Sequence, residues 1–234
     1  MNAPRGEADA VRERYARRPA AAQDARYRML NPAVWQSVHE RQRALLGLIA
    51  RAGFEDLSAL RLLEVGCGSG GNLLELLRMG FAPEHLRGIE LLPERWDQAR
   101  HVLPAALDLI EGDAVQADVA PASLDIVYVS TVFSSLLDAA FQQRLADAMW
   151  RWLRPGGAVL WYDFTVDNPR NADVRGVPLA RVRALFPRGQ LTARRVTLAP
   201  PIARAVCRVH PALYTACNAL PLLRTHLLCW IAKR

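Results

Sequence analysis

Short apolar segments alternate with helix-like segments between residues 60 and 164 of this 234-residue chain. The apolar segments are typical of buried strands, and the segments between them have the spacing of amphipathic helices. The strands are expected at residues 60–65, 86–91, 107–113, 124–131 and 158–164, and the helices at 70–80, 93–103 and 138–153. This alternation predicts an α/β fold, in which a doubly wound parallel sheet has helices on both faces. A ligand is then expected outside the carboxyl ends of the strands, where the strand order reverses.

The flanking regions complete this prediction. Residues 31–53 begin with an Asn-Pro helix-start signal and predict a helix, whereas residues 1–30 read as a polar helix or a partly disordered arm. After residue 165 a helix, a strand at 190–198, a helical segment at about 201–220 and a last strand at 224–233 are expected. We therefore predict an N-terminal helical extension or cap (1–56) and a main domain (57–234) with a helical insertion (199–222).

Composition excludes several classes of protein. The polar N-terminus lacks the apolar region of a signal peptide, and no stretch reaches the roughly 18 apolar residues of a membrane span. The four cysteines have no C-x-x-C spacing, so buried thiols are expected rather than disulfides or a metal site. These features predict a cytoplasmic protein that holds no metal.

Positive charge is concentrated at the end of the chain. The net charge is +7, yet residues 170–234 contain twelve Arg or Lys residues and a single acidic residue, Asp173. Such a region is either a solvated basic face or a surface for an acidic partner such as a phosphorylated substrate or an anionic lipid. Peripheral contact with an anionic membrane is therefore one interpretation of this region.

A glycine-rich loop, "GCGSGG", follows the first expected strand directly. Glycines allow positive φ and let a ligand approach the backbone closely. Gly66, Gly68 and Gly71 also satisfy the G-x-G-x-x-G pattern of dinucleotide sites, and Glu90 lies near the expected ribose position. An NAD-dependent oxidoreductase is therefore one hypothesis for this loop.

Three carboxylates at strand ends favour a different ligand. Glu64 stands two residues before the first glycine, where it repels a diphosphate but suits a cationic amino group or sulfonium. Glu90 ends the second strand and can accept hydrogen bonds from ribose hydroxyls, and Asp113 follows the third strand, where an adenine amine can donate to it. Together they indicate an adenosine with a positive, amino-acid-like tail, which is the chemistry of S-adenosylmethionine.

The motifs "LLEVGCGSGGN", "GIELLPER", "EGDA", "LDIVYVSTVFSSL" and "LRPGGAVLWYDF" occur in this order over residues 58–165. This set resembles the class I S-adenosylmethionine-dependent methyltransferases. The resemblance implies a Rossmann-like, seven-stranded sheet that is mostly parallel, with an antiparallel last strand. It also implies a set of cofactor-binding positions: Glu64, Gly66, Cys67, Gly68, Gly70, Asn72, Glu90, Leu91, Asp113, Ala114, Ser130 and Phe133.

Acceptor-side residues are less constrained by the sequence. Tyr162 and Asp163 end the fifth strand at the expected crevice, and His39 can reach it from the N-terminal helix, so these three are candidate catalytic bases. The next loop supplies four candidate substrate-binding residues, Asn168, Arg170, Asn171 and Arg175. The segment 199–222 is interpreted as a helix packed on the core, a lid, or an amphipathic surface for a lipid-linked substrate.

The function predicted is methyl transfer to a small-molecule or lipid-linked glycan acceptor, with a hydroxyl oxygen preferred. The glycan is suggested by residues beyond 165, which are similar to methyltransferases found with bacterial polysaccharide assembly genes. Nucleic acid is not expected, because "STVFSS" stands where amino-methylating enzymes usually have an Asn/Asp-Pro-Pro-aromatic stretch. The alternatives are another small-molecule or protein acceptor and a non-catalytic cofactor-binding module.

Overall fold

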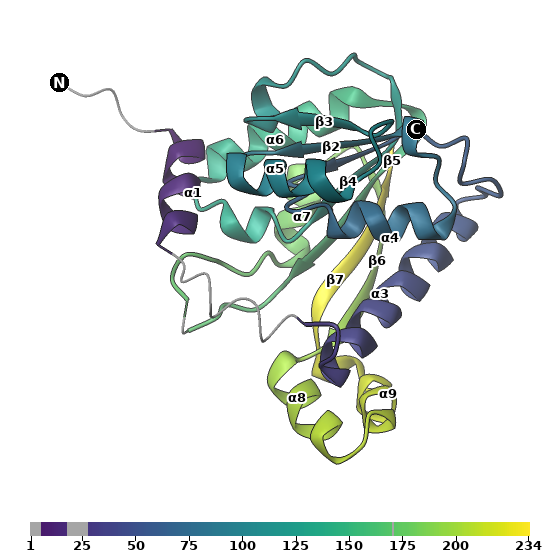
Figure 1. The fold of residues 1–234 in the computed structure, drawn as a ribbon, viewed down its shortest axis with the longest axis vertical. Coiled ribbons are helices and arrows are strands. Elements are labelled where there is room, and N and C mark those ends of the chain that lie inside the picture. Colours follow the sequence, from purple (N-terminus) through teal and green to yellow (C-terminus); the bar gives the residue numbers. More distant parts are fainter. Residues whose placement is uncertain (1–5, 18–27, 170) are drawn as a thin grey trace.

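The fold is built on one seven-stranded sheet, shown in Figure 1 as a computed structural model that describes residues 6–17, 28–169 and 171–234. The strand order is β3-β2-β1-β4-β5-β7-β6, and β7 runs antiparallel to both of its neighbours while all other pairs are parallel. The strands are β1 (Leu62–Val65), β2 (Leu86–Glu90), β3 (Asp108–Glu111), β4 (Leu124–Ser130), β5 (Leu153–Phe164), β6 (Gln190–Leu198) and β7 (Arg224–Ala232). The predicted fold is confirmed. The strand order reverses between β1 and β4, which places the crevice at their carboxyl ends.

Helices cover both faces of the sheet. One apolar core joins the sheet to α3 (Pro32–Arg51), α4 (Gly71–Met79) and α5 (Pro93–Val102). The other joins it to α6 (Ala139–Trp152) and α7 (Leu179–Leu185), and also takes in residues of α1 (Glu7–Ala16). The central strand β4 is buried along its whole length because it is covered from both sides. Asn31 caps α3 by accepting a hydrogen bond from the backbone of Ala33, as the Asn-Pro signal predicts.

The structure differs in detail from two local predictions. The fifth strand, expected at 158–164, begins at Leu153, so β5 also includes the residues "RPGG". The pairing of β4 with β5 shifts register beyond Leu124, and Gly156 takes a φ of +80°, so the turn-like residues form an irregularity inside the strand. The helical segment at 201–220 is two helices, α8 (Pro200–Val209) and α9 (Ala212–Asn218), because the chain bends at Pro211.

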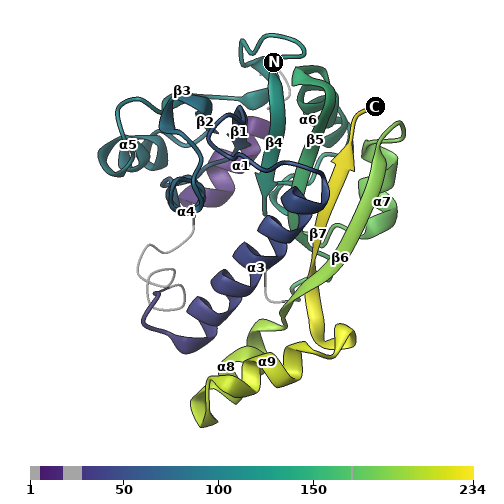
Figure 2. The ribbon, with the colours of Figure 1, turned by 90° about the vertical axis from the view of Figure 1, so that its right-hand side faces the viewer.

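Helices α8 and α9 project from the body of the molecule at the carboxyl end of β6 (Figure 1). A view from the side shows the start of α3 next to them (Figure 2). A small separate core of Ala33, Leu198, Ala203, Cys207 and Tyr214 holds this part together. Within the described part of the chain, no helix combines the length and the apolar character needed to cross a bilayer.

Candidate functional site

The glycine loop between β1 and α4 is fixed to β2 and open on one side. The backbone N–H groups of Gly66 and Cys67 both donate to the carbonyl oxygen of Ile89, at 2.8 and 3.0 Å. Gly68 has a φ of +57°, and a Cβ built on it would meet nothing within 4 Å. A Cβ on Gly66 would instead lie 2.6 Å from Cγ2 of Val132. The loop therefore needs glycine at both positions, but only Gly68 leaves space where a ligand can lie.

Glu64, at the end of β1, is a fully buried carboxylate that is half satisfied. Its Oε1 accepts a hydrogen bond of 2.6 Å from Asn72, whereas Oε2 has no partner among the described residues. Burial raises the pKa of Glu64 to about 8. A buried carboxylate oxygen without a donor is costly, and a cationic donor would satisfy it and restore its charge.

Glu90, at the end of β2, ties the first two strand ends together. Its Oε2 accepts from the backbone of Gly68 at 2.7 Å, and its Oε1 accepts from the backbone of Leu92 at 2.9 Å. Each carboxylate oxygen keeps a second lone pair, so Glu90 can still accept from two further donors. Leu91, the next residue, is half-buried against the core.

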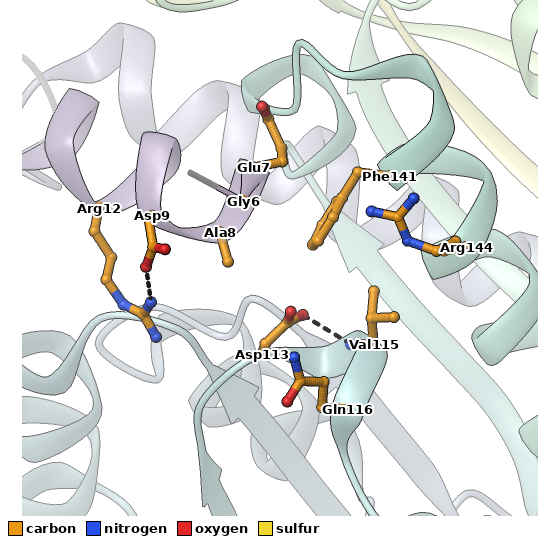
Figure 3. Close-up of a pocket in the computed structure, with 10 residues that line it drawn as sticks. All are labelled: Gly6, Glu7, Ala8, Asp9, Arg12, Asp113, Val115, Gln116, Phe141 and Arg144. Atoms are coloured by element: carbon orange, nitrogen blue, oxygen red, sulfur yellow. Dashed lines mark hydrogen bonds and ion pairs between the residues drawn. The ribbon is translucent and has the colours of Figure 1, made fainter. Parts of the chain in front are cut away.

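Asp113 lies at a cavity beyond the third strand (Figure 3). It caps the 3₁₀ turn η2 (Ala114–Gln116) by accepting a hydrogen bond of 2.9 Å from the backbone of Val115, and Ala114 packs against the core. The cavity measures about 420 Å³ and lies between η2, α6 and the start of α1. Its other lining residues include Glu7, Asp9, Arg12, Gln116, Phe141 and Arg144.

Helix α1 lies across the carboxyl edge of the sheet and is held there by a buried ion pair. Arg14 donates to Glu7 at 2.6 Å and to the backbone of Ser135 at 3.0 Å. Glu7 also accepts from the backbone of Leu137 at 2.7 Å. On the opposite side, the guanidinium of Arg95 in α5 lies 4.6 Å from the ring centre of Tyr15. Sequence reasoning missed Glu7 and Arg14, because their backbone partners, Leu137 and Ser135, are more than 120 residues away.

The loop after β4 is held by Asp163. One carboxylate oxygen of Asp163 accepts from the backbone of Ser134 at 3.0 Å, the other accepts from the backbone of Phe164 at 2.9 Å, and the side chain is 1% exposed. Burial raises the pKa of Asp163 to about 7. These contacts are those of a carboxylate that positions a loop, so the catalytic role of Asp163 stays a prediction that the geometry does not favour.

Two further residues of this region were predicted to contact the cofactor. Ser130 is buried at the end of β4, at the edge of the crevice. Phe133 is fully buried, and its ring centre lies 4.5 Å from that of Trp161 in the core. Phe133 therefore supports the loop from below rather than facing the crevice.

A polar network links α3 to the acceptor side of the crevice. Glu40 accepts from the backbone of Thr197 at 2.9 Å and from the hydroxyl of Tyr214 at 3.0 Å. The hydroxyls of Tyr162 and Thr197 are 2.9 Å apart, and the ring of Tyr162 stacks on His226 with centres 4.9 Å apart. Burial, followed by the charge of Arg41, lowers the pKa of His226 to about 4.

Arg41 joins this network to the cofactor side. Its guanidinium donates to Glu75 at 2.9 Å and to Asn72 at 3.0 Å, and Asn72 in turn donates to Glu64. Arg41 also lies 5.3 Å from the ring centre of Tyr162. Nothing in the sequence pointed to Arg41 or Glu40, because a charged pair on a helix normally marks a solvated face.

The remaining predicted residues are dispersed. His39 is half-buried on α3, and its ring lies 5.8 Å from that of Trp35. Asn171 accepts from the backbone of Asp173 within a turn, and the backbone of Asn168 accepts from Asn171 in the same turn. The backbone of Arg175 donates to the carbonyl oxygen of Ser134, which places this loop beside the β4 loop. Arg170 lies outside the described residues.

Comparisons with known proteins agree with this geometry. Residues 62–157 match a family described as "Methyltransferase domain". The chain is 36% identical over 132 residues to a phthiotriol/phenolphthiotriol dimycocerosates methyltransferase of Mycobacterium ulcerans. The matched region is 54% of this chain and 47% of that protein. It is 36% identical over 110 residues to a fatty-acid O-methyltransferase of Mycolicibacterium smegmatis, with 46% and 38% covered. The chain thus spans about half the length, or less, of the curated relatives it matches.

A solved structure shows the same fold. A SAM-dependent methyltransferase from Archaeoglobus fulgidus superimposes with a TM-score of 0.59 at 12% identity, covering 82% of this chain and 94% of the other. At this identity the likeness concerns the fold alone.

Proposed function

We propose that this chain is a class I S-adenosylmethionine-dependent methyltransferase and that it transfers a methyl group to an oxygen atom of a lipid-like small molecule. The observation that carries the methyl-transfer part is Glu64, whose unpartnered buried oxygen lies at the mouth of the glycine loop. The acceptor class is supported by the names of the two relatives, which act on a phthiotriol or phenolphthiotriol dimycocerosate and on a fatty acid. The glycan acceptor expected from the sequence is not confirmed.

The residues of the crevice fit S-adenosylmethionine. Glu64 would accept from its amino group, Glu90 from its ribose hydroxyls and Asp113 from its adenine amine, and Gly68 leaves open space beside the loop. A diphosphate would lie against Glu64 and Glu90, which disfavours a dinucleotide at the same place. Gly66, Cys67, Gly70 and Asn72 would shape the loop, with the backbone of Cys67 fixed to β2 and Asn72 orienting Glu64.

The protein's own contribution to this reaction is mainly positioning. When bound, the cofactor supplies a methyl group that is already activated by its sulfonium. Helix α1 covers the adenine end of the crevice and keeps water from it, and Asp163 fixes the β4 loop at which the acceptor would be aligned. Correct alignment of two reactants contributes about 7–11 kcal/mol to lowering a barrier.

The acceptor oxygen decides whether a base is needed. A carboxylate is already ionised at neutral pH, whereas a hydroxyl must lose its proton, which a positioned base accelerates by about 10²–10⁴. The hydroxyl of Tyr162 is bonded to Thr197 and the Asp163 oxygens are bonded to backbone N–H groups. These engagements favour an acceptor that reaches the crevice as an anion, and Tyr162, Asp163 and His39 remain predicted bases for a hydroxyl.

Calorimetry and a transfer assay test this function. We expect S-adenosylmethionine and its demethylated product to bind, and NAD not to bind. With a methyl-labelled cofactor, label should enter fatty acids or hydroxylated lipids that partition into organic solvent. Binding of NAD alone would contradict the methyltransferase assignment, and cofactor binding without transfer to any lipid, sugar or protein pool would favour a binding-only module.

A further inference from the structure

The projecting part of the molecule exposes an unusual number of apolar side chains. We call this part the tip and define it as residues 199–223 together with residues 29–31 at the start of α3. Ten large apolar side chains are exposed among the described residues, and six of them belong to the tip: Met29, Leu30, Val209, Leu213, Leu220 and Leu222. Leu222 and Leu30 are 94% and 93% exposed, which is unusual for a segment whose other face is packed.

The only charged side chains of the tip are cationic. No Asp or Glu follows Asp173 in the sequence, and the tip contains Arg204 and Arg208 on α8. Both are exposed, lie one helical turn apart, and form no hydrogen bond or ion pair with residues 6–17, 28–169 or 171–234. Arg194 and Arg195, also exposed, add positive charge in the middle of β6, the strand that leads to the tip. Exposed apolar groups flanked by arginines are complementary to the headgroups and acyl boundary of an anionic bilayer.

The tip is connected rigidly to the acceptor side of the crevice. Tyr214 of α9 donates to Glu40 of α3, and Glu40 accepts from the backbone of Thr197, next to the last residue of β6. Gln36 of α3 also donates to the backbone of Pro211, between α8 and α9, at 3.1 Å. A surface that holds the tip therefore also fixes the orientation of the crevice.

We propose that the tip docks the chain on an anionic lipid bilayer. Leu220, Leu222 and Val209 enter the acyl boundary, and Arg204 and Arg208 lie among the headgroups. Docking presents the acceptor side of the crevice to a lipid substrate that remains in the membrane. This purpose rests on the proposed function, whereas the docking itself is measured without catalysis.

Vesicle co-sedimentation of the full chain tests the proposal. We expect the chain to sediment with vesicles of phosphatidylcholine and phosphatidylglycerol, to bind weakly to phosphatidylcholine alone, and to be released by salt. Removing both charges (Arg204→Gln with Arg208→Gln) should weaken binding roughly thirty-fold at low salt. Removing two apolar side chains (Leu220→Ser with Leu222→Ser) should weaken it about tenfold or more, with less dependence on salt.

Matched variants away from the tip serve as controls. Leu74→Ser with Val102→Ser, and Arg51→Gln with Arg78→Gln, change exposed residues of the same kinds on α3, α4 and α5. The proposal is wrong if these controls weaken vesicle binding as much as the tip variants do, or if no variant changes it. It is also wrong if sedimentation equilibrium shows a dimer that the apolar tip variant dissociates, because the tip would then be buried between two copies of the chain. Cofactor calorimetry on the same samples separates this outcome from failure of the proposed function.

Discussion

The cofactor side of the crevice and the network on its acceptor side differ in how completely their buried polar groups are hydrogen-bonded. On the cofactor side, Glu64 keeps an oxygen without a partner and Gly68 borders open space. On the acceptor side, Glu40, Tyr162, Thr197 and Tyr214 are joined in one network. Buried polar groups in folded proteins are nearly always paired, so the fully buried, unpaired carboxylate oxygen of Glu64 beside the open glycine loop is a candidate ligand contact.

This difference indicates where specificity resides. The cofactor side offers charged groups whose full satisfaction requires a ligand of one particular chemistry. The acceptor-side network of Glu40, Tyr162, Thr197 and Tyr214 is already paired, so we expect it to gain little from a polar contact of a substrate. Recognition of the acceptor then depends on shape and on how the molecule is delivered to the crevice.

The largest effect on cofactor affinity is expected when Glu64 is replaced with Gln. The amide keeps the shape of the side chain but cannot pair with a cationic amino group, and the loss of one partner from a buried charge pair costs about 3 kcal/mol. Calorimetry should therefore show about a hundredfold loss of affinity for S-adenosylmethionine. Glu84→Gln, at an exposed position in η1 (Pro83–His85), is the control and should leave affinity unchanged. Equal affinities of the two variants for S-adenosylmethionine would show that Glu64 does not contact the cofactor.

The same substitution should raise the stability of the cofactor-free protein at high pH. The pKa of Glu64 in the folded chain, about 8, lies above its ordinary value of 4.5. Its contribution to folding stability is therefore fully present below pH 4.5 and is lost as the pH rises through 8. Gln does not ionise, so the Tm of Glu64→Gln should exceed that of the wild type increasingly between pH 6 and 9. A constant difference over this range would show that Glu64 does not titrate there.

Helix α1 offers a matched pair of substitutions on one turn. Glu7→Gln leaves the buried guanidinium of Arg14 without its counter-ion, which should loosen α1 and weaken cofactor binding about tenfold, mainly by faster dissociation. Asp9→Asn removes an exposed pair with Arg12, whose value is about 0–1 kcal/mol, and should change affinity less than about twofold. Stopped-flow release of the cofactor distinguishes the two, and equal release rates would mean that α1 does not retain it.

The sequence alone indicates which residues share the cofactor side more readily than it indicates those of the acceptor side, for a physical reason. Glu64 and Glu90 lie at the ends of β1 and β2 and Asp113 follows β3, so the parallel topology alone brings them to one edge. The contacts of Glu7, Arg14, Glu40 and Arg41 join segments more than 30 residues apart, and no periodicity specifies them. The burial of Phe133 was missed for a related reason, because a turn after the strand returns its side chain to the core.

A substitution in the acceptor-side network should leave the affinity for the cofactor nearly unchanged. The amide of Glu40→Gln can still accept from Thr197 or Tyr214, but it lacks the negative charge that strengthens both hydrogen bonds. We therefore expect the free energy of unfolding to fall by about 1–2 kcal/mol. Affinity for S-adenosylmethionine should stay within about twofold, while KM for the acceptor rises more than kcat falls. Gln36→Ala, which removes a weaker contact with Pro211, is the control for the same helix. A loss of cofactor affinity equal to that of Glu7→Gln would mean that the two sides are not separable.

The smallest effect is expected at Cys67, although it lies in the middle of the cofactor loop. Its thiol is 5% exposed, burial raises its pKa well above the usual range, and its Sγ packs against Gly88, where an added Cβ would approach to 2.8 Å. The thiol is therefore directed into the core, and only the backbone of Cys67 takes part in the loop. Cys67→Ala should lower stability by about 1 kcal/mol through the cavity it leaves, with cofactor affinity within about twofold. Alkylation of the native protein near pH 8 gives an independent measurement, because a buried neutral thiol reacts slowly. Rapid modification of Cys67 that bound S-adenosylmethionine prevents would instead place the thiol on the ligand side of the loop.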